Sequence, residues 1–186
     1  MTTANMITLG RIALIPVFMY CAISDGAQGN WVALAIFAFA SLTDGIDGYI
    51  ARKYNQITDF GKLVDPLADK LLVMSALLIL LEQGVLPSWA CILILAREFM
   101  VSSLRSIAAS KGVVLAASKW GKIKTCSQLI CVMYLLAGLD DILLFERLSL
   151  QNVLICIMVF FTVFSGYDYL NHNFNLIKDG LVKEEK

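Results

Sequence analysis

Two pairs of aspartates stand in sequence that is otherwise apolar. Asp44 and Asp47 lie in the segment SLTDGIDGYIAR, and Asp65 and Asp69 lie in GKLVDPLADK. Placing one carboxylate in a membrane costs roughly 2.5–3.5 kcal/mol, and carboxylates that lie close together also repel one another. The chain has too few lysines and arginines nearby to neutralise all four, so the pattern predicts bound divalent metal. Ligation by oxygen alone favours a hard cation, with Mg²⁺ first and Mn²⁺ next.

The spacing within each pair is helical. Asp44 and Asp47 (i, i+3) would share one helix face, and Asp65 and Asp69 (i, i+4) would share another. A loop of about ten residues, 53–62, joins the two segments, so we expect an antiparallel hairpin of helices with both pairs at a similar depth. Four converging carboxylates can hold two metal ions about 3.5–4 Å apart, an arrangement used in phosphoryl chemistry. The sequence therefore predicts a metal-dependent enzyme site.

Small residues and one cation accompany the aspartates. Gly45, Gly48 and Gly61 remove side chains beside the cluster, which leaves room for a diphosphate headgroup to approach the backbone. Arg52, one turn beyond Gly48, is placed to bind a phosphate through two hydrogen bonds. A structural alternative stays open, because single acids in a membrane often pair with basic residues and glycines often serve helix packing.

The elements that must position these residues are apolar helices. The chain has 186 residues, of which 59% are hydrophobic, against about 45–50% in a soluble domain. Runs of about 20 apolar residues predict membrane spans. Six such runs occur, at 8–24, 31–52, 63–83, 88–109, 120–138 and 148–170. With the polar start TTANMITLGR as a short interfacial helix, we predict a single all-α integral membrane domain over residues 1–186, with six transmembrane helices plus an N-terminal interfacial amphipathic helix.

The basic residues predict the orientation of these spans. The loops after the first, third and fifth spans contain one basic residue, Arg147, and the other lysines and arginines fall at the opposite ends. The positive-inside rule places both termini, and the aspartate end of the hairpin, in the cytoplasm. Formal net charge is zero, so nothing indicates a nucleic-acid partner. Five cysteines without a CxxC pair predict reduced thiols rather than a zinc site.

The aspartates belong to a longer motif. Residues 44–69 read D-x-x-D-G-x-x-A-R-x8-G-x3-D-x3-D, which resembles the signature of the CDP-alcohol phosphotransferase family at every fixed position. The N-terminal N-x-x-T-x-x-R (Asn5, Thr8, Arg11) and the segments FGKLVDPLADK, AREFMVSSLR and GKIKT are most similar to the bacterial phosphatidylglycerophosphate synthase branch. The resemblance runs from about residue 4 to residue 170.

This resemblance implies a reaction and a set of roles. Such enzymes transfer the phosphatidyl group from CDP-diacylglycerol to sn-glycerol 3-phosphate and release CMP at the cytoplasmic face of the bacterial inner membrane. By resemblance, the four aspartates would ligate two Mg²⁺ ions, and Asp69 would also act as the catalytic general base. The residues that would bind CDP-diacylglycerol are Asn5, Thr8, Gly48, Ala51, Arg52 and Gly61. Homodimers, surrounded by membrane lipids, are usual among these proteins.

An anionic acceptor needs a cationic pocket of its own. The four candidates for its phosphate, all near the cytoplasmic ends of the fourth and fifth spans, are Arg97, Arg105, Lys122 and Lys124. Arginine is the better partner for two parallel hydrogen bonds to phosphate. The alternative is that these side chains only extend to the lipid headgroups. Glu98 would either orient Arg97 or pair with another neighbour.

Two rival functions stay open from the sequence. The same chemistry would serve another alcohol, such as serine, a choline-type acceptor, inositol phosphate or phosphatidylglycerol, although a cationic pocket favours a phosphorylated acceptor. A divalent-cation transporter would also use intramembrane carboxylates, but such sites usually lie near the midplane and across repeated halves. The predicted cluster lies nearer the cytoplasmic surface, and the chain has no visible repeat.

Overall fold

A computed structural model describes most of the chain. The described residues are 3–24, 31–53, 59–110, 112–113, 115, 118–139, 143–145 and 148–173. Within the helices, the side chains of residues 3–8, 44–53, 59–63, 65, 66 and 69 are outside the described set, although their backbone belongs to it.

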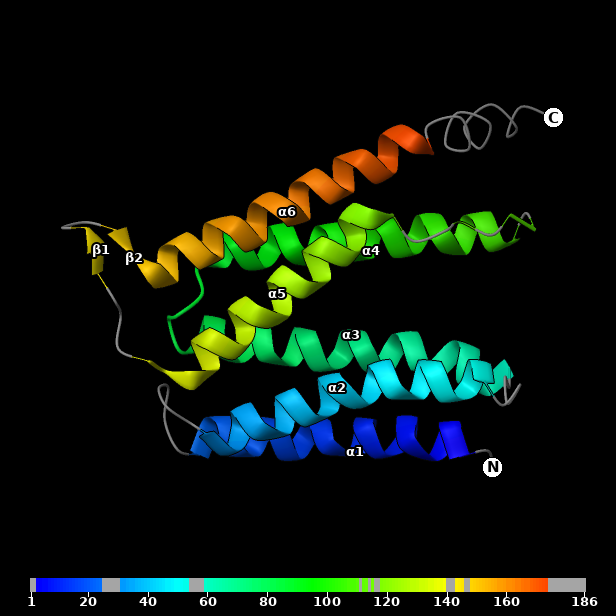
Figure 1. Cartoon of the computed structure of the whole chain (residues 1–186), viewed down its shortest axis with the longest axis horizontal. Helices are drawn as coiled ribbons and strands as arrows, with labels where there is room; N and C mark the ends of the chain where they lie inside the picture. Colours follow the sequence, from blue (N-terminus) through cyan, green and yellow to red (C-terminus); the bar gives the residue numbers. More distant parts are fainter. Residues whose placement is uncertain are drawn as a thin grey trace. The chain divides into compact units, whose positions relative to one another are not determined.

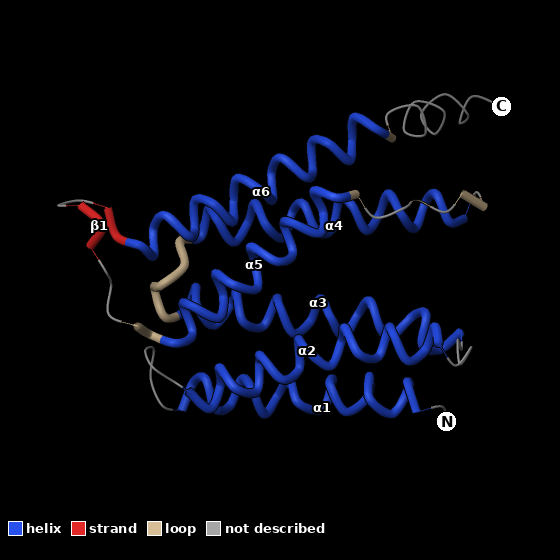
Figure 2. Tube along the Cα trace, in the orientation of Figure 1, coloured by secondary structure: helices blue, strands red, loops and turns tan. Residues whose placement is uncertain are grey.

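Six helices and one small hairpin make up the described chain (Figure 2). The elements are α1 (Thr3–Ser24), α2 (Trp31–Lys53), α3 (Asp59–Glu82), α4 (Ser88–Ser110), α5 (Lys119–Ala137), β1 (Leu143–Phe145), β2 (Leu148–Ser149) and α6 (Leu150–His172). The predicted all-α class is confirmed for the six helices. The antiparallel pair β1–β2 is an addition. Strand β1 lies between the spans predicted at 120–138 and 148–170, and β2 takes the first two residues of the latter span.

Two predicted boundaries need correction. The polar N-terminal segment is not a helix of its own, because α1 continues without a break from Thr3 to Ser24. Pro16 stands inside α1 without ending it, as proline does in membrane helices where neighbours satisfy the freed backbone groups. The loop predicted at 53–62 is shorter, since α3 already begins at Asp59.

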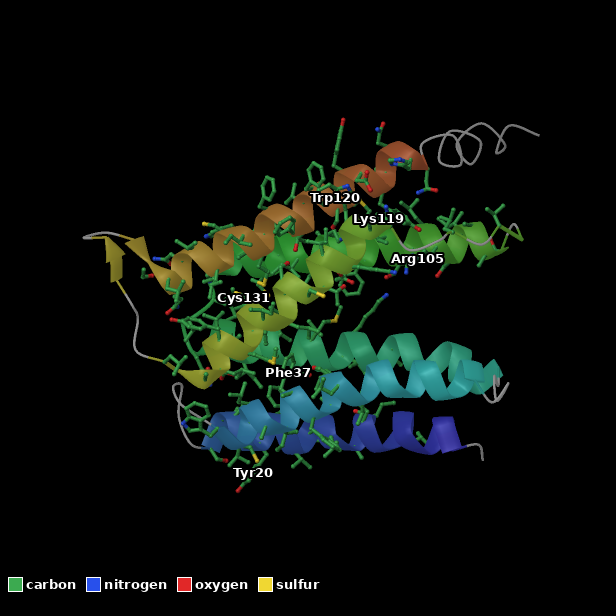
Figure 3. The ribbon with its side chains drawn as sticks, viewed as in Figure 1. Tyr20, Phe37, Arg105, Lys119, Trp120 and Cys131 are labelled. Atoms are coloured by element: carbon green, nitrogen blue, oxygen red, sulfur yellow. The ribbon has the colours of Figure 1, made fainter. Side chains whose placement is uncertain are left out.

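Helices α1, α2 and α3 form one compact unit, which also includes the last residues of α5. Helix α1 packs against both α2 and α3, and α2 contacts α3 (Figure 1). The rings of Phe18 and Phe37 lie 5.8 Å apart in the core of this unit. Figure 3 shows Phe37 inside the unit, whereas the exposed side chain of Tyr20 points away from it. Helices of 22, 23 and 24 residues are about 33–36 Å long, close to the roughly 30 Å hydrocarbon thickness of a bilayer.

Helices α4 and α6, the first part of α5 and the hairpin form a second unit. Helix α4 packs against α6. The hydroxyl of Ser149 accepts a hydrogen bond from the backbone N–H of Asn152 at 3.2 Å, which caps the beginning of α6. At the other end of α6, Phe164 meets the ring of Trp120 edge to face at 4.6 Å. These contacts fix the helices that carry the predicted acceptor pocket.

Among the described residues, helix α6 is long and apolar enough to cross a membrane. Shorter apolar stretches occupy Leu9–Ser24 and Trp31–Thr43. The other helices interrupt their apolar runs with charges, such as the aspartates of α3 and the basic residues of α4 and α5. Helix α6 leaves Phe160 and Tyr167 exposed, and large exposed apolar side chains of this kind mark a surface made to contact lipid or another protein.

Candidate functional site

The two aspartate pairs occupy matching levels on α2 and α3. Their side chains lie outside the described set, but their backbone is helical. Asp47 lies six residues before the end of α2 at Lys53, and Asp65 lies six residues after the beginning of α3 at Asp59. Both positions are thus about 9 Å from the connected ends of the two helices. Asp44 and Asp69, nine and ten residues from the same ends, lie about 14 Å away.

On α2, the aspartate positions continue the interior stripe of the helix. Ala33, Phe37 and Ala40 are fully buried and recur every three or four residues. Positions 44 and 47 extend this series by one step of four and one of three. Residues spaced in this way share one helix face, so Asp44 and Asp47 stand in line with the packed face of α2.

On α3, the same relation holds in the opposite direction. Leu72, Ala76 and Ile79 are buried within the three-helix unit. Positions 69 and 65 extend this series toward the beginning of the helix by one step of three and one of four. Because α2 and α3 contact each other, the two series belong to the same unit, and the helical spacing predicts that both aspartate pairs follow them. The ligation of metal by their carboxylates stays a prediction.

The six residues predicted to bind CDP-diacylglycerol have side chains outside the described set. Their backbone positions nevertheless gather at one end of the three-helix unit. Asn5 and Thr8 lie in the first turns of α1, Gly48, Ala51 and Arg52 in the last turns of α2, and Gly61 in the first turn of α3. Figure 1 shows the beginning of α1, the end of α2 and the beginning of α3 at this same end.

Helix α1 contributes a buried arginine to the same unit. Arg11 is only 2% exposed, and it lies eight residues after the beginning of α1, or about 12 Å along the helix. Arg11 belongs to the N-terminal family motif, but its burial was not predicted. A buried cation in this unit would help to offset the charge of the predicted carboxylate cluster.

The second unit contains a partly buried cluster of three charged residues. The Oε1 atom of Glu98, on α4, accepts hydrogen bonds from Arg97 Nη1 at 3.0 Å and from Lys124 Nζ on α5. Lys124 is 3% exposed, and the side chain of Arg97 is 11% exposed. Two of the four predicted acceptor cations therefore meet at one carboxylate oxygen, and the cluster keeps a formal charge of +1.

Two glycines lie beside Arg97, and one of them is needed for its close approach. A Cβ added to Gly166, on α6, would lie 3.1 Å from Arg97 Cγ, which is tighter than ordinary contact. A Cβ added to Gly121, on α5, would lie 3.7 Å from Arg97 Nη2, an ordinary van der Waals distance. Neither glycine has a positive φ. We name Arg97, Glu98, Lys124, Gly121 and Gly166 the Glu98 cluster.

Two buried hydrogen-bond donors, one in the Glu98 cluster and one on α5 beyond it, have no partner among the described residues. The buried Nε of Arg97 has no hydrogen-bond partner among the described residues, and neither has the buried Nε2 of Gln128. Gln128 lies one turn beyond Lys124 on α5 and is itself buried. A buried donor without a partner costs about 1–3 kcal/mol. An anion that accepted a hydrogen bond from Arg97 Nε would remove the cost at that atom, and this would suit a phosphate.

The other two predicted cations differ from the first pair. Arg105 is exposed, and its Nε donates a hydrogen bond to the hydroxyl of buried Tyr169 at 3.3 Å, with the guanidinium 5.5 Å from the ring centre. Lys122 is exposed, and the structure does not bring it into the Glu98 cluster. Figure 3 shows Arg105 on α4 and the residues Lys119 and Trp120 at the beginning of α5.

Sequence reasoning missed Tyr169, Gly166 and Gln128. These three residues are uncharged and belong to no recognised motif, so no local pattern separated them from packing residues. For metal, no group of three or more His, Cys, Asp or Glu side chains that could hold an ion occurs among the described side chains, which do not include the four aspartates.

Comparisons with known proteins agree on one family. The family model described as CDP-alcohol phosphatidyltransferase matches residues 1–164. The CDP-diacylglycerol–glycerol-3-phosphate 3-phosphatidyltransferase of Bacillus subtilis (strain 168) is 43% identical over 94% of this chain and 96% of its own length. The protein of the same name from Rickettsia felis is 37% identical over 89% of this chain and 91% of its own. The probable phosphatidylglycerophosphate synthase of Mycobacterium tuberculosis (strain H37Rv) is 40% identical over 90% of this chain and 79% of its own.

Proposed function

Because this chain belongs to the CDP-alcohol phosphatidyltransferase family, we propose that it transfers the phosphatidyl group of CDP-diacylglycerol to sn-glycerol 3-phosphate. The products are phosphatidylglycerol phosphate and CMP. Relatives with this activity in their names cover nine-tenths of the chain at about 40% identity. Within the structure, the observation that supports a phosphorylated acceptor is the partly buried Glu98 cluster, since its net positive charge and the unpaired Nε of Arg97 suit an anionic alcohol.

The four aspartates suit a pair of hard divalent cations. Their positions extend the packed faces of two contacting helices at two matched levels, and their donor atoms are all oxygen, which favours Mg²⁺ over softer metals and leaves Mn²⁺ as the alternative. Asp44, Asp47, Asp65 and Asp69 would hold two such ions. When bound, the metal neutralises charge on the diphosphate oxygens and makes CMP a better leaving group.

The residues of the chain divide the remaining work. Asp69 accepts the proton of the acceptor hydroxyl while that oxygen bonds to the phosphorus carrying the diacylglycerol and the bond from phosphorus to the CMP oxygen breaks. A carboxylate is a weak base, but it needs only to accept the proton as the new bond forms. Arg52 binds the cytidine diphosphate part, and Asn5, Thr8, Gly48, Ala51 and Gly61 frame it, because all six positions lie at the same end of the unit.

The acceptor phosphate is bound by cations of α4 and α5. Arg97 and Lys124 form the buried part of this pocket, and Arg105, held by Tyr169, supplies a second guanidinium. Lys122 adds positive charge from an exposed position. An acceptor without net charge, such as zwitterionic serine, would not offset the net positive charge of this pocket, which favours a phosphorylated alcohol.

The family is one of membrane enzymes, and α6 has the length and apolarity of a span. We extend this to six spans in the bacterial cytoplasmic membrane, with both termini and the site on the cytoplasmic side. The distribution of lysine and arginine among the loops supports that orientation. The active form would be a homodimer surrounded by membrane lipids.

The proposed function is tested by supplying each alcohol in turn. Purified protein in mixed micelles receives CDP-diacylglycerol and Mg²⁺, and CMP release is followed with sn-glycerol 3-phosphate, inositol phosphate, serine or phosphatidylglycerol. We expect release with glycerol 3-phosphate and none with serine. Release with serine alone would contradict the acceptor. Metal uptake into liposomes without any nucleotide lipid would instead support a divalent-cation transporter.

A further inference from the structure

We infer that Glu98 is a positioning residue, which holds Arg97 and Lys124 together as one fixed cationic pair for the acceptor phosphate. This inference rests on the proposed function, because it assigns a role within the acceptor pocket. Glu98 is not itself expected to touch the substrate, since a carboxylate beside a phosphate would repel it. Its effect would therefore pass through the two cations.

The contact between Arg97 and Glu98 is not what helix geometry alone produces. Neighbouring residues on a helix point about 100° apart, and i, i+1 side chains do not normally face each other. Here Arg97 Nη1 nevertheless lies 3.0 Å from Glu98 Oε1. The same oxygen accepts a hydrogen bond from Lys124, which lies 26 residues later on another helix. One atom thus connects α4 to α5 and sets where both positive charges stand.

The glycines confine the arginine from the other side. A Cβ at position 166 would lie 3.1 Å from Arg97 Cγ and 3.5 Å from Met100 Cε, which is closer than a methyl group normally approaches Cγ. The aliphatic part of Arg97 therefore packs directly on the backbone of α6. With its stem held by Gly166 and one end of its guanidinium held by Glu98, the unpaired Nε of Arg97 keeps a defined position.

Two roles for Glu98 predict opposite results. If Glu98 only reduced the positive charge of the pocket, then its neutralisation would strengthen the binding of an anionic acceptor. If it positions the cations, then its neutralisation would loosen them and weaken that binding. Hydrogen bonds to a charged group are stronger than those between neutral groups, so Glu98→Gln preserves shape and removes the strong hold.

The first measurement uses Glu98→Gln in the full-length protein. We expect the KM for glycerol 3-phosphate to rise about tenfold, while the KM for CDP-diacylglycerol and the thermal midpoint of unfolding stay near the unmodified values. The control Glu82→Gln makes the same chemical change at an exposed glutamate at the end of α3. It should leave both KM values as they are.

The second measurement moves Arg97 without changing any charge. In Gly166→Ala the new methyl group displaces Arg97 Cγ, and we expect the KM for glycerol 3-phosphate to rise roughly two- to tenfold, as for a side chain forced off its preferred rotamer. In an Arg97→Ala background, neither Glu98→Gln nor Gly166→Ala should add its full single-variant effect, because both would act through the arginine.

The outcomes separate the two levels of the proposal. An unmodified protein that releases no CMP with glycerol 3-phosphate would overturn the proposed function. An active unmodified protein whose Glu98→Gln variant has an unchanged or lower KM for glycerol 3-phosphate would overturn the role of Glu98 alone. Equal losses toward both substrates, together with a lower unfolding midpoint, would also overturn it, because they would show a purely structural residue.

Discussion

At the scale of single residues, the charged residues of the candidate site form two groups with different chemistry. The aspartates of α2 and α3 supply only oxygen and negative charge, whereas the Glu98 cluster supplies hydrogen-bond donors and net positive charge. A phosphatidyl transfer needs both, because a metal-bound diphosphate and an anionic alcohol must be bound separately before they react. Each group can therefore be tested through its own substrate.

Asp69→Asn should abolish turnover and leave the protein folded. Asparagine retains the size of the side chain but cannot accept the proton of the acceptor hydroxyl, and loss of a general base lowers kcat by about 10²- to 10⁴-fold. CMP release measures the rate, and binding of CDP-diacylglycerol checks that the site is intact. A variant that retained a nearly normal rate would show that the proton goes to another group.

Lys124→Ala and Lys122→Ala form a matched pair. Lys124 is 3% exposed and paired with Glu98, whereas Lys122, two residues earlier on the same helix, is exposed. Removing one partner of a buried ion pair is more damaging than removing a surface charge. We expect Lys124→Ala to raise the KM for glycerol 3-phosphate at least tenfold and Lys122→Ala to raise it less. Equal rises in KM for the two variants would contradict a special role of the buried Lys124 in binding the acceptor phosphate.

At the scale of elements, capping explains where α6 begins. The hydroxyl of Ser149, which is buried, accepts a hydrogen bond from the backbone N–H of Asn152. Ser149→Ala removes this hydrogen bond and should lower the free energy of unfolding by about 1 kcal/mol. The thermal midpoint in detergent measures the loss. Ser103→Ala, at an exposed position within α4, is the control and should stay within about 0.5 kcal/mol of the unmodified protein.

The helices could be predicted from the sequence because long apolar runs have few other solutions in a membrane. The residues at which the helices begin and end were harder to predict. Continuity of α1 depends on Pro16 being tolerated inside a helix, and the early start of α3 at Asp59 depends on a polar segment adopting helix despite its composition. Strands β1 and β2 are joined by two residue pairs, and strands this short leave no alternating pattern in the sequence from which they could be predicted.

The candidate site was predictable to a similar degree. The aspartates and the four cations stand out because charge is rare in apolar helices. The neighbours of those cations do not stand out, since Gly166 and Tyr169 lie more than 60 residues from the arginines that they contact. Only packing of α6 against α4 brings them together, and no local spacing reports such a pairing.

At the scale of the whole molecule, metal should couple activity to stability. A ligand that binds only the folded state stabilises it, by about 2.7 kcal/mol at a hundred times its dissociation constant. Removal of divalent ions with a chelator should stop CMP release and lower the thermal midpoint of unfolding. Mg²⁺ or Mn²⁺ should restore both. Full turnover in excess chelator would contradict a requirement for metal at the four aspartates.

The two aspartate levels lie about 9 and 14 Å from the connected ends of α2 and α3. Their depth affects how the substrates reach the site and how the product leaves it. In the proposed membrane orientation, a lipid substrate whose phosphates lie at that depth would reach these positions by lateral diffusion, and its acyl chains would stay in the bilayer. Only glycerol 3-phosphate and CMP would then have to pass between the cytoplasm and the site. The width of the opening that admits these two molecules would therefore affect the rate of turnover.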